Sequence, residues 1–328
     1  EIRERADIAE VIGDYVTLKR AGANLKGVCP FHADSDPSFN VNPDRQFFHC
    51  FGCGASGDVF TFLRRIEGLD FMEAVERLAG RFGVELPRER ISPAARTAQE
   101  RAREETRRRR RVLEAAAEFF EAQLAAPAGA AGLRMLDARG IDGETAARYR
   151  LGFAPDGWQG LLDHLASQRI GAREAAEAGL ALERRSGSGH YDRFRNRLVF
   201  TITDAAGHPI AFSARAVDDE ERGAKYVNSP ETADFSKGKV LYGLHQARVA
   251  LSKTREAVLV EGNFDVVSLA RVGVENVVAP LGTALTEEHA ALLRRRVDRV
   301  VVLYDGDAAG QAAAARAFPI LARAGLAA

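Results

Sequence analysis

All three cysteines of this 328-residue chain fall in one short stretch, where they form two close pairs with a histidine. The first pair is Cys29 and His32, the second is Cys50 and Cys53, and 17 residues separate the pairs. Two such pairs on separate turns can converge on one tetrahedral ion, and cysteine and histidine suit Zn²⁺. Four protein ligands leave no open coordination position, so we expect a structural zinc site.

His49 is a competing fourth ligand, but it adjoins Cys50 and fits the tetrahedron less well. If the cysteines were only small buried side chains, two regularly spaced pairs would be chance. Three cysteines in a chain of this size are not a disulfide framework and indicate a reducing compartment. Aromatic and basic residues together can stack on and neutralise single-stranded DNA, although most phenylalanines of a small ribbon form its core. Such residues here are Phe31, Phe39, Phe47, Phe48, Phe51, Lys19, Arg20, Lys26 and Arg45.

The length of the chain is enough for two or three domains. We expect a compact module at 1–87, a charged linker or exposed helix at 88–111, and further domains at 112–250 and 251–328. The linker contains the run Arg107–Arg111, for which a role as a DNA-binding arm stays open. The net charge of zero does not by itself indicate a nucleic-acid partner. No run of 18 apolar residues or signal peptide occurs, and the natural N-terminus is expected upstream of Glu1.

After Glu256 the sequence alternates between short apolar runs and amphipathic stretches, which predicts a parallel sheet with crossover helices. We expect strands at 258–260, 277–279 and 300–304, and helices at 265–272, 287–295 and 308–322. Glu261 directly follows the first strand, and Asp305 and Asp307 follow the third. Ligands bind at the carboxyl edge of such sheets, where Asp265 can join these acids. Clustered carboxylates suit Mg²⁺, which serves phosphoryl transfer.

Two other interpretations apply to these acids. Asp305 could open a calcium-binding loop, but its fifth and twelfth positions would be Ala309 and Arg316, which cannot supply the oxygen ligands. Alternatively, the acids cap helix N-termini, which explains one carboxylate but not acids at two strand ends. No G-x4-G-K-[S/T] motif occurs, so this segment contains no P-loop.

The middle of the chain is basic. Arg193, Arg195 and Arg197 alternate with other residues, and the period of a strand predicts that they share one face. Such a cationic face would hold nucleotide phosphates or template backbone, whereas the alternative is a solvated edge strand. A second basic stretch runs over 225–239. The candidate binding residues are Arg193, Arg195, Arg197, Arg215, Lys225, Asn228, Ser229 and Lys237.

Together these motifs resemble the bacterial replicative primase family. Residues 15–58 are similar to its zinc-binding signature, with CPFH at 29–32, PSF at 37–39 and HCFGCG at 49–54. Residues 225–244, KYVNSPETADFSKGKVLYGL, resemble its basic polymerase motif. VEG at 260–262 with Asp265, LGTALT at 281–286 and YDGD at 304–307 resemble its toprim half. The resemblance covers almost the whole chain in the same order.

The resemblance implies a multidomain fold: an N-terminal zinc ribbon, β-rich with flanking helices, then an α+β subdomain and an α/β toprim-like parallel sheet. It implies a DNA-directed RNA polymerase that makes short primers from NTPs on single-stranded DNA, with one structural Zn²⁺ and with Mg²⁺ or Mn²⁺ for catalysis. Glu261, Asp305 and Asp307 would be metal-site acids, with Asp265 beside them. Arg195, Arg197, Lys225 and Lys237 would bind nucleic acid or nucleotides.

The same resemblance implies an RNA–DNA hybrid product and a place at the replisome in the bacterial cytoplasm. It also implies a replicative helicase as partner, bound through a C-terminal domain that would follow Ala328, as would a further acidic pair. It implies no membrane partner. Asn263-Phe264 and Ser213-Ala214 depart from the family's usual Tyr-Met and Gly-Gly. The alternatives are a toprim-type nuclease or topoisomerase-like enzyme, for which no nucleophilic tyrosine domain is evident, and a zinc-ribbon protein that only binds DNA.

Overall fold

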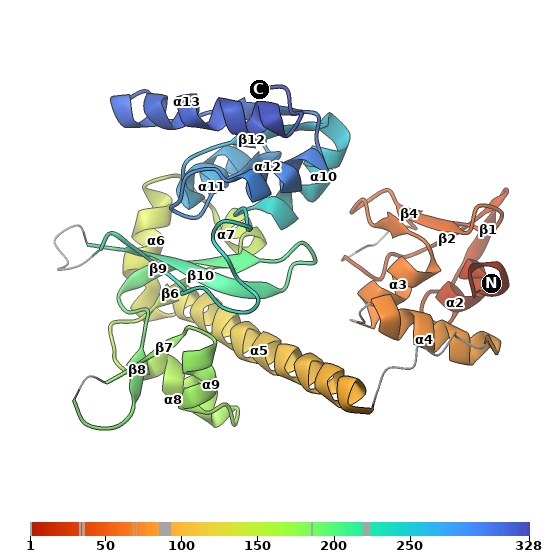
Figure 1. The fold of residues 1–328 in the computed structure, drawn as a ribbon, viewed down its shortest axis with the longest axis horizontal. Coiled ribbons are helices and arrows are strands. Elements are labelled where there is room, and N and C mark those ends of the chain that lie inside the picture. Colours follow the sequence, from red (N-terminus) through yellow and green to blue (C-terminus); the bar gives the residue numbers. More distant parts are fainter. Residues whose placement is uncertain are drawn as a thin grey trace. The chain divides into compact units, whose positions relative to one another are not determined.

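The computed structural model describes residues 2–32, 34, 37–67, 69, 71–84, 93–184, 186–218 and 224–328. The chain divides into two units, Glu1–Arg96 and Thr97–Ala328 (Figure 1). Among the described residues, one hydrophobic cluster lies in the first unit and three lie in the second. Residues 88–92 of the predicted linker lie outside the described residues, and from Pro93 the chain is helical.

The first unit is a five-stranded antiparallel sheet with helices beside it, in the strand order β1-β2-β3-β4-β5. Phe62 of helix α3 packs against Phe39 of β3 and Phe48 of β4, with ring centroids 6.1 and 5.7 Å away, and all three rings are buried. Asp7 and Asp58 cap helices α2 and α3 through their side-chain oxygens. The elements are α1 (Ile2–Arg5), α2 (Ile8–Gly13), β1 (Lys19–Ala21), β2 (Asn24–Gly27), β3 (Phe39–Asn42), β4 (Phe47–Cys50), β5 (Ser56–Gly57), α3 (Val59–Ile66) and α4 (Phe71–Phe82).

The second unit begins with an α+β part built on an antiparallel sheet of order β11-β10-β9-β6. Strand β9 (Arg197–Thr203) is buried along its whole length, because β10 (Pro209–Ala216) and β6 (Leu151–Ala154) pair with its two edges. A smaller hairpin of β7 (Ala181–Glu183) and β8 (His190–Asp192) packs with two short helices. The remaining elements are η1 (Pro127–Gly129), α6 (Ala130–Asp137), α7 (Gly143–Arg148), α8 (Gly160–Ser167), α9 (Ala172–Glu177) and β11 (Tyr226–Asn228).

The C-terminal part is a parallel three-stranded sheet of order β13-β12-β14, surrounded by helices (Figure 1). The alternation predicted after Glu256 is confirmed, with boundaries shifted by a few residues at most. These elements are α10 (Leu244–Thr254), β12 (Glu256–Leu259), α11 (Asn263–Arg271), β13 (Val277–Val278), α12 (Glu287–Arg294), β14 (Arg299–Val302) and α13 (Ala308–Arg323).

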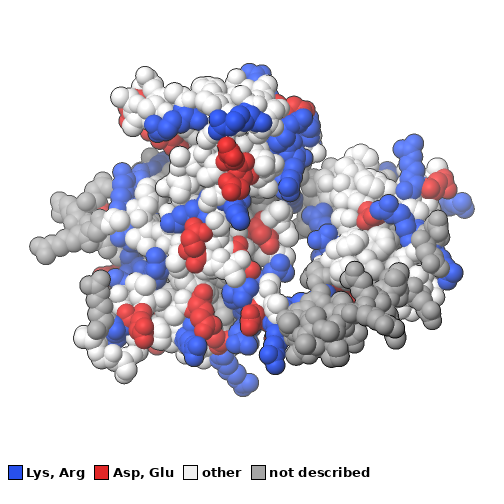
Figure 2. All heavy atoms as spheres, viewed as in Figure 1, with Lys and Arg blue, Asp and Glu red and all other residues white. Residues whose placement is uncertain are grey.

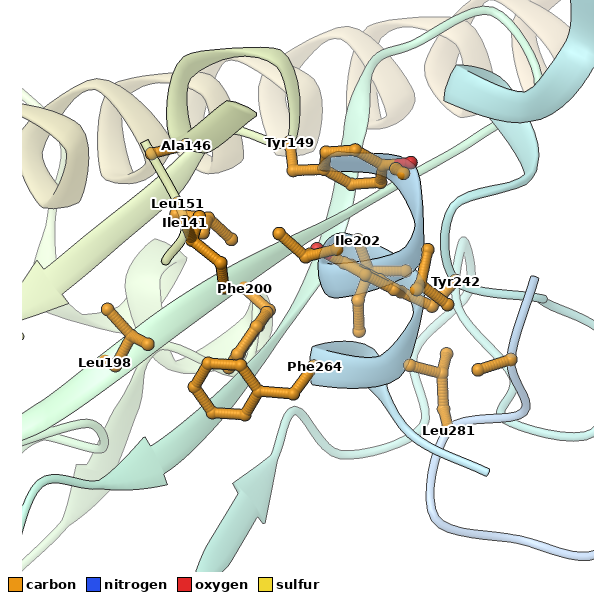
Figure 3. Close-up of a cluster of buried hydrophobic side chains, with 14 of the residues drawn as sticks. Ile141, Ala146, Tyr149, Leu151, Leu198, Phe200, Ile202, Tyr242, Phe264 and Leu281 are labelled. Atoms are coloured by element: carbon orange, nitrogen blue, oxygen red, sulfur yellow. The ribbon is translucent and has the colours of Figure 1, made fainter. Parts of the chain in front are cut away.

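One hydrophobic cluster joins the two parts of the second unit (Figure 3). Phe200 of β9 meets Phe264 of α11 edge to face, with ring centroids 4.9 Å apart, and it also contacts Tyr242 at 6.0 Å. Aromatic pairs of this geometry add about 0.5–1.5 kcal/mol beyond their burial. The antiparallel sheet and the parallel sheet are therefore held by a shared core.

Helix α5 (Pro93–Ala125) takes up the charged stretch that was predicted as a linker or an exposed helix. Alanine, glutamate and arginine are good helix formers, which explains its length of 33 residues. The arginine run contacts several other segments of the second unit, so it holds the helix in place. Its partners are Glu174 for Arg108, Asp234 for Arg109, Asp204 for Arg110 and the Gln168 carbonyl for Arg111.

Within the part of the chain that the structure describes, no helix has both the length and the apolar character that crossing a membrane requires.

Candidate functional site

The two cysteine-containing pairs meet in the first unit. One ligand atom from each of Cys29, His32, Cys50 and Cys53 lies within 4.8 Å of all the others. The sulfur atoms of Cys29 and Cys53 are 3.8 Å apart. Two sulfur ligands that each lie about 2.3 Å from a tetrahedral ion are about 3.8 Å from each other, so the group fits Zn²⁺. The group contains His32, whereas His49 contacts the Phe51 ring edge to face with ring centroids 4.6 Å apart.

Local structure brings the ligands together. Cys50 ends β4, and the backbone N–H of Cys53 donates to its sulfur over 3.4 Å. Gly52 must be a glycine, because a Cβ atom there would lie 2.7 Å from His32 Nε2. Burial raises the pKa of the Cys29 thiol to about 12. Burial also raises the pKa of Cys50, but hydrogen bonds led by that from Ser38 outweigh it and leave this pKa below its ordinary value.

The carboxylate of Asp34 contacts residues that hold the ligand group in place. Asp34 Oδ2 accepts hydrogen bonds from the backbone N–H of Cys29 at 3.0 Å and from Ser38 Oγ at 2.6 Å. Its other oxygen lies 3.8 Å from Nε2 of His32, whose Nδ1 is 3.9 Å from the Cys50 sulfur. Carboxylates beside a ligating histidine commonly orient it. The spacing of cysteines and histidine gave no sign of this residue.

The aromatic residues of the zinc module separate into two groups. Phe39 and Phe48 are fully buried and form the core, as expected for a ribbon. Phe47 and Phe51 are exposed by 43% and 74%. Lys19 on β1 pairs directly with Lys26 on β2, and both are exposed. Phe31 is half-buried, so Phe47 and Phe51 are the most exposed of the five candidate phenylalanines and the most accessible for stacking on bases.

The strands of the parallel sheet bring the acidic residues to one edge of the second unit. β12 and β14 are in register up to Leu259 and Val302, and the backbone then continues to Glu261 and Asp305. Glu261 Oε1 accepts a hydrogen bond from the Asp305 backbone N–H over 2.9 Å. Gly310 allows this approach, because a Cβ atom there would lie 2.8 Å from Glu261 Oε1 and 2.2 Å from the Asp305 carbonyl oxygen.

Two of the acids also have local partners. Asp307 caps helix α13 by accepting from the Gly310 N–H at 2.7 Å, and Asp265 accepts from the Gly262 N–H at 2.9 Å. Partial burial of the Asp265 carboxyl group raises its pKa, and the negative charges of Asp305 and Glu261 raise it further. Among the described residues, only the Cys/His group has three or more ligand atoms within 4.8 Å of one another. No three of the acids therefore have carboxylate oxygens as close together as the zinc-ligand atoms are.

The prediction that Arg193, Arg195 and Arg197 share one strand face is wrong. β9 begins at Arg197, and a turn with Asn196 at a φ of 48° precedes it, so the alternation of a strand does not apply. Arg197 is only 7% exposed and donates to the carbonyls of Ala224 and Lys225 at 2.9 and 3.3 Å. It therefore ties β9 to the segment before β11.

The other two arginines have different surroundings. Arg193 donates to the Asn228 carbonyl at 3.1 Å, and burial lowers its pKa. The guanidinium of Arg195 lies 4.2 Å from the ring centroid of Trp158, which is the single tryptophan of the chain and is 58% exposed. Tyr191 lies on the same guanidinium at 5.3 Å. This partly exposed cluster of Arg195 with two aromatic rings was not predicted, although the single tryptophan of the chain is a usable signal.

The remaining candidates, apart from Lys237, lie on β10 or β11 or directly beside these strands. Arg215 lies 5.5 Å from the Tyr226 ring and 5.3 Å from the Phe264 ring, and its Nε is buried without a hydrogen-bond partner. Asn228 donates to the Leu281 carbonyl at 3.5 Å, while its Oδ1 is buried and unpartnered. Ser229 is buried and its hydroxyl accepts from the Phe212 N–H, a structural role. Lys225 is exposed and Lys237 is partly exposed.

A cavity of about 290 Å³ adjoins Arg215 and adds two arginines that were not predicted. Arg134 and Arg139 line it, and the Arg139 guanidinium lies 4.3 Å from the Phe264 ring centroid. Phe264, which replaces the expected methionine, thus contacts both Arg139 and Arg215. On the face seen in Figure 2, basic and acidic side chains are interspersed over the second unit, in keeping with the net charge of zero.

Three family models match the chain in succession. They are the CHC2 zinc finger at residues 1–93, the N-terminal domain of the DNA primase catalytic core at 119–248, and the toprim domain at 255–328. The Cys/His group lies in the first match and the acids lie in the third.

The similar proteins and solved structures that follow are DNA primases or their domains. A DNA primase of Halalkalibacterium halodurans is 47% identical over 326 residues, which are 99% of this chain and 53% of that protein. The structure of the Aquifex aeolicus primase zinc-binding and RNA polymerase domains is 36% identical, with a TM-score of 0.63, over 99% of this chain and 76% of that one.

The RNA polymerase domain of Mycobacterium tuberculosis primase, in complex with a double-stranded DNA oligomer with a 6-nucleotide overhang, is 37% identical with a TM-score of 0.60. That match covers 64% of this chain and 68% of that one. The chain spans about half the length of the curated relatives it matches.

Proposed function

Because this chain belongs to the DNA primase family, we propose that it makes short RNA primers from NTPs on a single-stranded DNA template. The observation that carries the proposal is the meeting of Glu261 and Asp305 at neighbouring strand ends, in a chain that also folds a Cys/His module. The DNA complex of a related polymerase domain supports DNA as the template. The RNA–DNA hybrid would be the product.

The acids Glu261, Asp305 and Asp307 would hold Mg²⁺ or Mn²⁺, with Asp265 beside them. Their oxygen donors suit both ions, and no hydrogen bond or ion pair among the described residues accounts for the Asp305 carboxylate. When bound, such an ion supplies charge stabilisation of the phosphate oxygens and of the leaving group. Asp307 and Asp265 are held by backbone N–H groups, which fixes the direction of their carboxylates.

The basic residues would hold the nucleotide for the attack of a 3′-hydroxyl on the α-phosphate, after which pyrophosphate leaves. Guanidinium groups bind phosphate by paired hydrogen bonds, and the Arg215 guanidinium lies beside the rings of Tyr226 and Phe264 in a cavity that Arg134 and Arg139 also line. Lys225 and Lys237 add further positive charge. Arg193, Arg195 and Arg197 stay candidates for template or nucleotide binding, although Arg197 has the least access to solvent.

We propose that residues 1–87 fold around one structural Zn²⁺ and contact the template, with Phe47 and Phe51 stacking on its bases. Residues 88–111 would connect this module to the polymerase core at 112–250 and to the toprim part at 251–328. Replicative helicase would be bound through a domain outside this chain. The protein would act in the bacterial cytoplasm, where its thiols stay reduced.

The proposal is tested with the full-length protein, a single-stranded template, labelled NTPs and Mg²⁺. A ladder of short RNA products is expected. Nicked DNA would instead indicate a nuclease or topoisomerase-like enzyme, and template binding without any product would indicate a DNA-binding protein.

A further inference from the structure

The segment from Ser229 to Gly243 carries Lys237 and has almost no regular secondary structure. Its backbone polar groups therefore need partners from elsewhere. At Lys237 both groups have one. The backbone N–H donates to Glu231 Oε1 at 3.0 Å, and the carbonyl faces Nε2 of His289 at 2.9 Å. The backbone from which the Lys237 side chain projects is thus fixed on both sides.

His289 is completely buried on helix α12 and uses both ring nitrogens. Nδ1 accepts a hydrogen bond from the Thr286 backbone N–H at 3.2 Å. Nε2 lies between two carbonyl oxygens, that of Lys237 and that of Val240 at 3.1 Å. Carbonyls only accept, so Nε2 carries the proton and the imidazole is neutral. Burial lowers the pKa of His289, in agreement with this state.

Thr286 completes the attachment. Its hydroxyl donates to the Gly238 carbonyl at 2.6 Å and accepts from the His289 backbone N–H at 3.1 Å. Thr286 and His289 form a capping box in which histidine takes the place usually held by glutamate or glutamine. The start of α12 therefore satisfies three carbonyls of the Lys237–Val240 segment at once.

We propose that His289 is a positioning residue that holds Lys237 in place for nucleotide or template binding. Helix α12 belongs to the same parallel-sheet part of the second unit as Glu261, Asp305 and Asp307. His289 therefore connects the backbone of Lys237 to the part of the protein that carries these acids. The effect of His289 on the reaction rests on the proposed function, whereas its hold on the segment does not.

The first test measures the segment itself. His289→Leu removes the hydrogen bonds to the two carbonyls, and His289→Gln can keep only part of them. A lysine-specific protease should cleave after Lys237 and Lys239 at least about 10-fold faster in His289→Leu, because the Lys237 and Val240 carbonyls lose their hydrogen-bond partner and the segment opens more easily. Cleavage after Lys253, on helix α10, should not change. His164→Leu, a histidine on helix α8, is the control and should leave all of these rates unaltered.

The second test measures primer synthesis in the full-length protein. Small misplacements of a binding group lower rates by up to about 100-fold, so kcat/KM for NTPs should fall about 10–100-fold in His289→Leu and less in His289→Gln. In a Lys237→Ala background the same His289 substitution should cost less than about 2-fold, because residues that act through one another are not additive.

Equal losses of kcat/KM in both backgrounds, or unchanged cleavage after Lys237 in both His289 variants, would overturn the proposal. If His289→Leu does not fold, His289→Gln decides the question alone. A wild-type protein that makes no primers would refute the proposed function, while the cleavage rates would still show whether His289 holds the segment.

Discussion

Arg195 and Arg197 are two residues apart, yet we expect their replacement by alanine to have different consequences. Arg197 is buried and donates to two backbone carbonyls, and hydrogen bonds of charged groups contribute about 1.5–3 kcal/mol. Because both bonds use one nitrogen, we expect Arg197→Ala to lower the free energy of unfolding by about 3 kcal/mol. For a unit of this size that corresponds to a fall in Tm of about 9 °C.

Arg195→Ala should leave the fold largely intact. It removes partly exposed cation–π contacts with Trp158 and Tyr191 and a partly exposed hydrogen bond to the Asp192 carbonyl. Together these contribute about 1–2 kcal/mol, or about 3–6 °C in Tm. If Arg195 contacts a phosphate of the template, the slope of log affinity against log salt should become shallower by about 0.7. The assays are thermal unfolding and fluorescence anisotropy with labelled single-stranded DNA at several salt concentrations. Equal losses of stability in the two variants, or an unchanged salt slope for Arg195→Ala, would refute this reasoning.

Metal analysis should find one Zn per chain, and Cys50→Ala should lose it and unfold the first unit as judged by circular dichroism; carefully prepared protein without zinc would contradict the site. Burial lowers the pKa of His289 below its ordinary value of 6.5, so the unfolded chain binds a second imidazole proton more readily than the folded chain does. The contribution of neutral His289 to the free energy of unfolding is therefore complete above about pH 6.5 and decreases as the pH falls below that value. The negative charge of Glu288 raises the pKa of His289 and so opposes the effect of burial, but burial is the larger cause. In urea unfolding at several pH values, the free energy of unfolding of His289→Gln should decrease less below about pH 6.5 than that of the wild type. Parallel curves of this free energy against pH would show that His289 is not the group responsible.

The zinc ligands were predictable because their spacing is local. Cys29 and His32, like Cys50 and Cys53, are near neighbours in sequence, so each pair needs only one turn to converge. The strand–helix alternation after Glu256 was equally readable, since apolar runs and amphipathic stretches report burial directly. The positions of Glu261 and Asp305 at neighbouring strand ends followed from that topology, whereas the distances between their carboxylates depend on side-chain directions that no pattern encodes.

Other features depend on contacts between distant residues. Period-two reasoning failed at Arg195 because this residue precedes β9, and a left-handed residue, Asn196, bends the backbone before the strand begins. The charged stretch of α5 resembled a linker because its partners, such as Asp234 for Arg109, lie far along the sequence. His289 carried no motif of its own, and only the structure reveals that it lies against Lys237.

The most direct measurement is primer synthesis together with template affinity for Asp307→Asn in the full-length protein. Asp307 caps helix α13, and asparagine caps about as well as aspartate, so the substitution preserves the helix and removes one negative charge. If Asp307 holds a catalytic ion, synthesis should fall by orders of magnitude while DNA affinity stays near that of the wild type. Near-normal synthesis would contradict the account, because the carboxylate would then be only a cap.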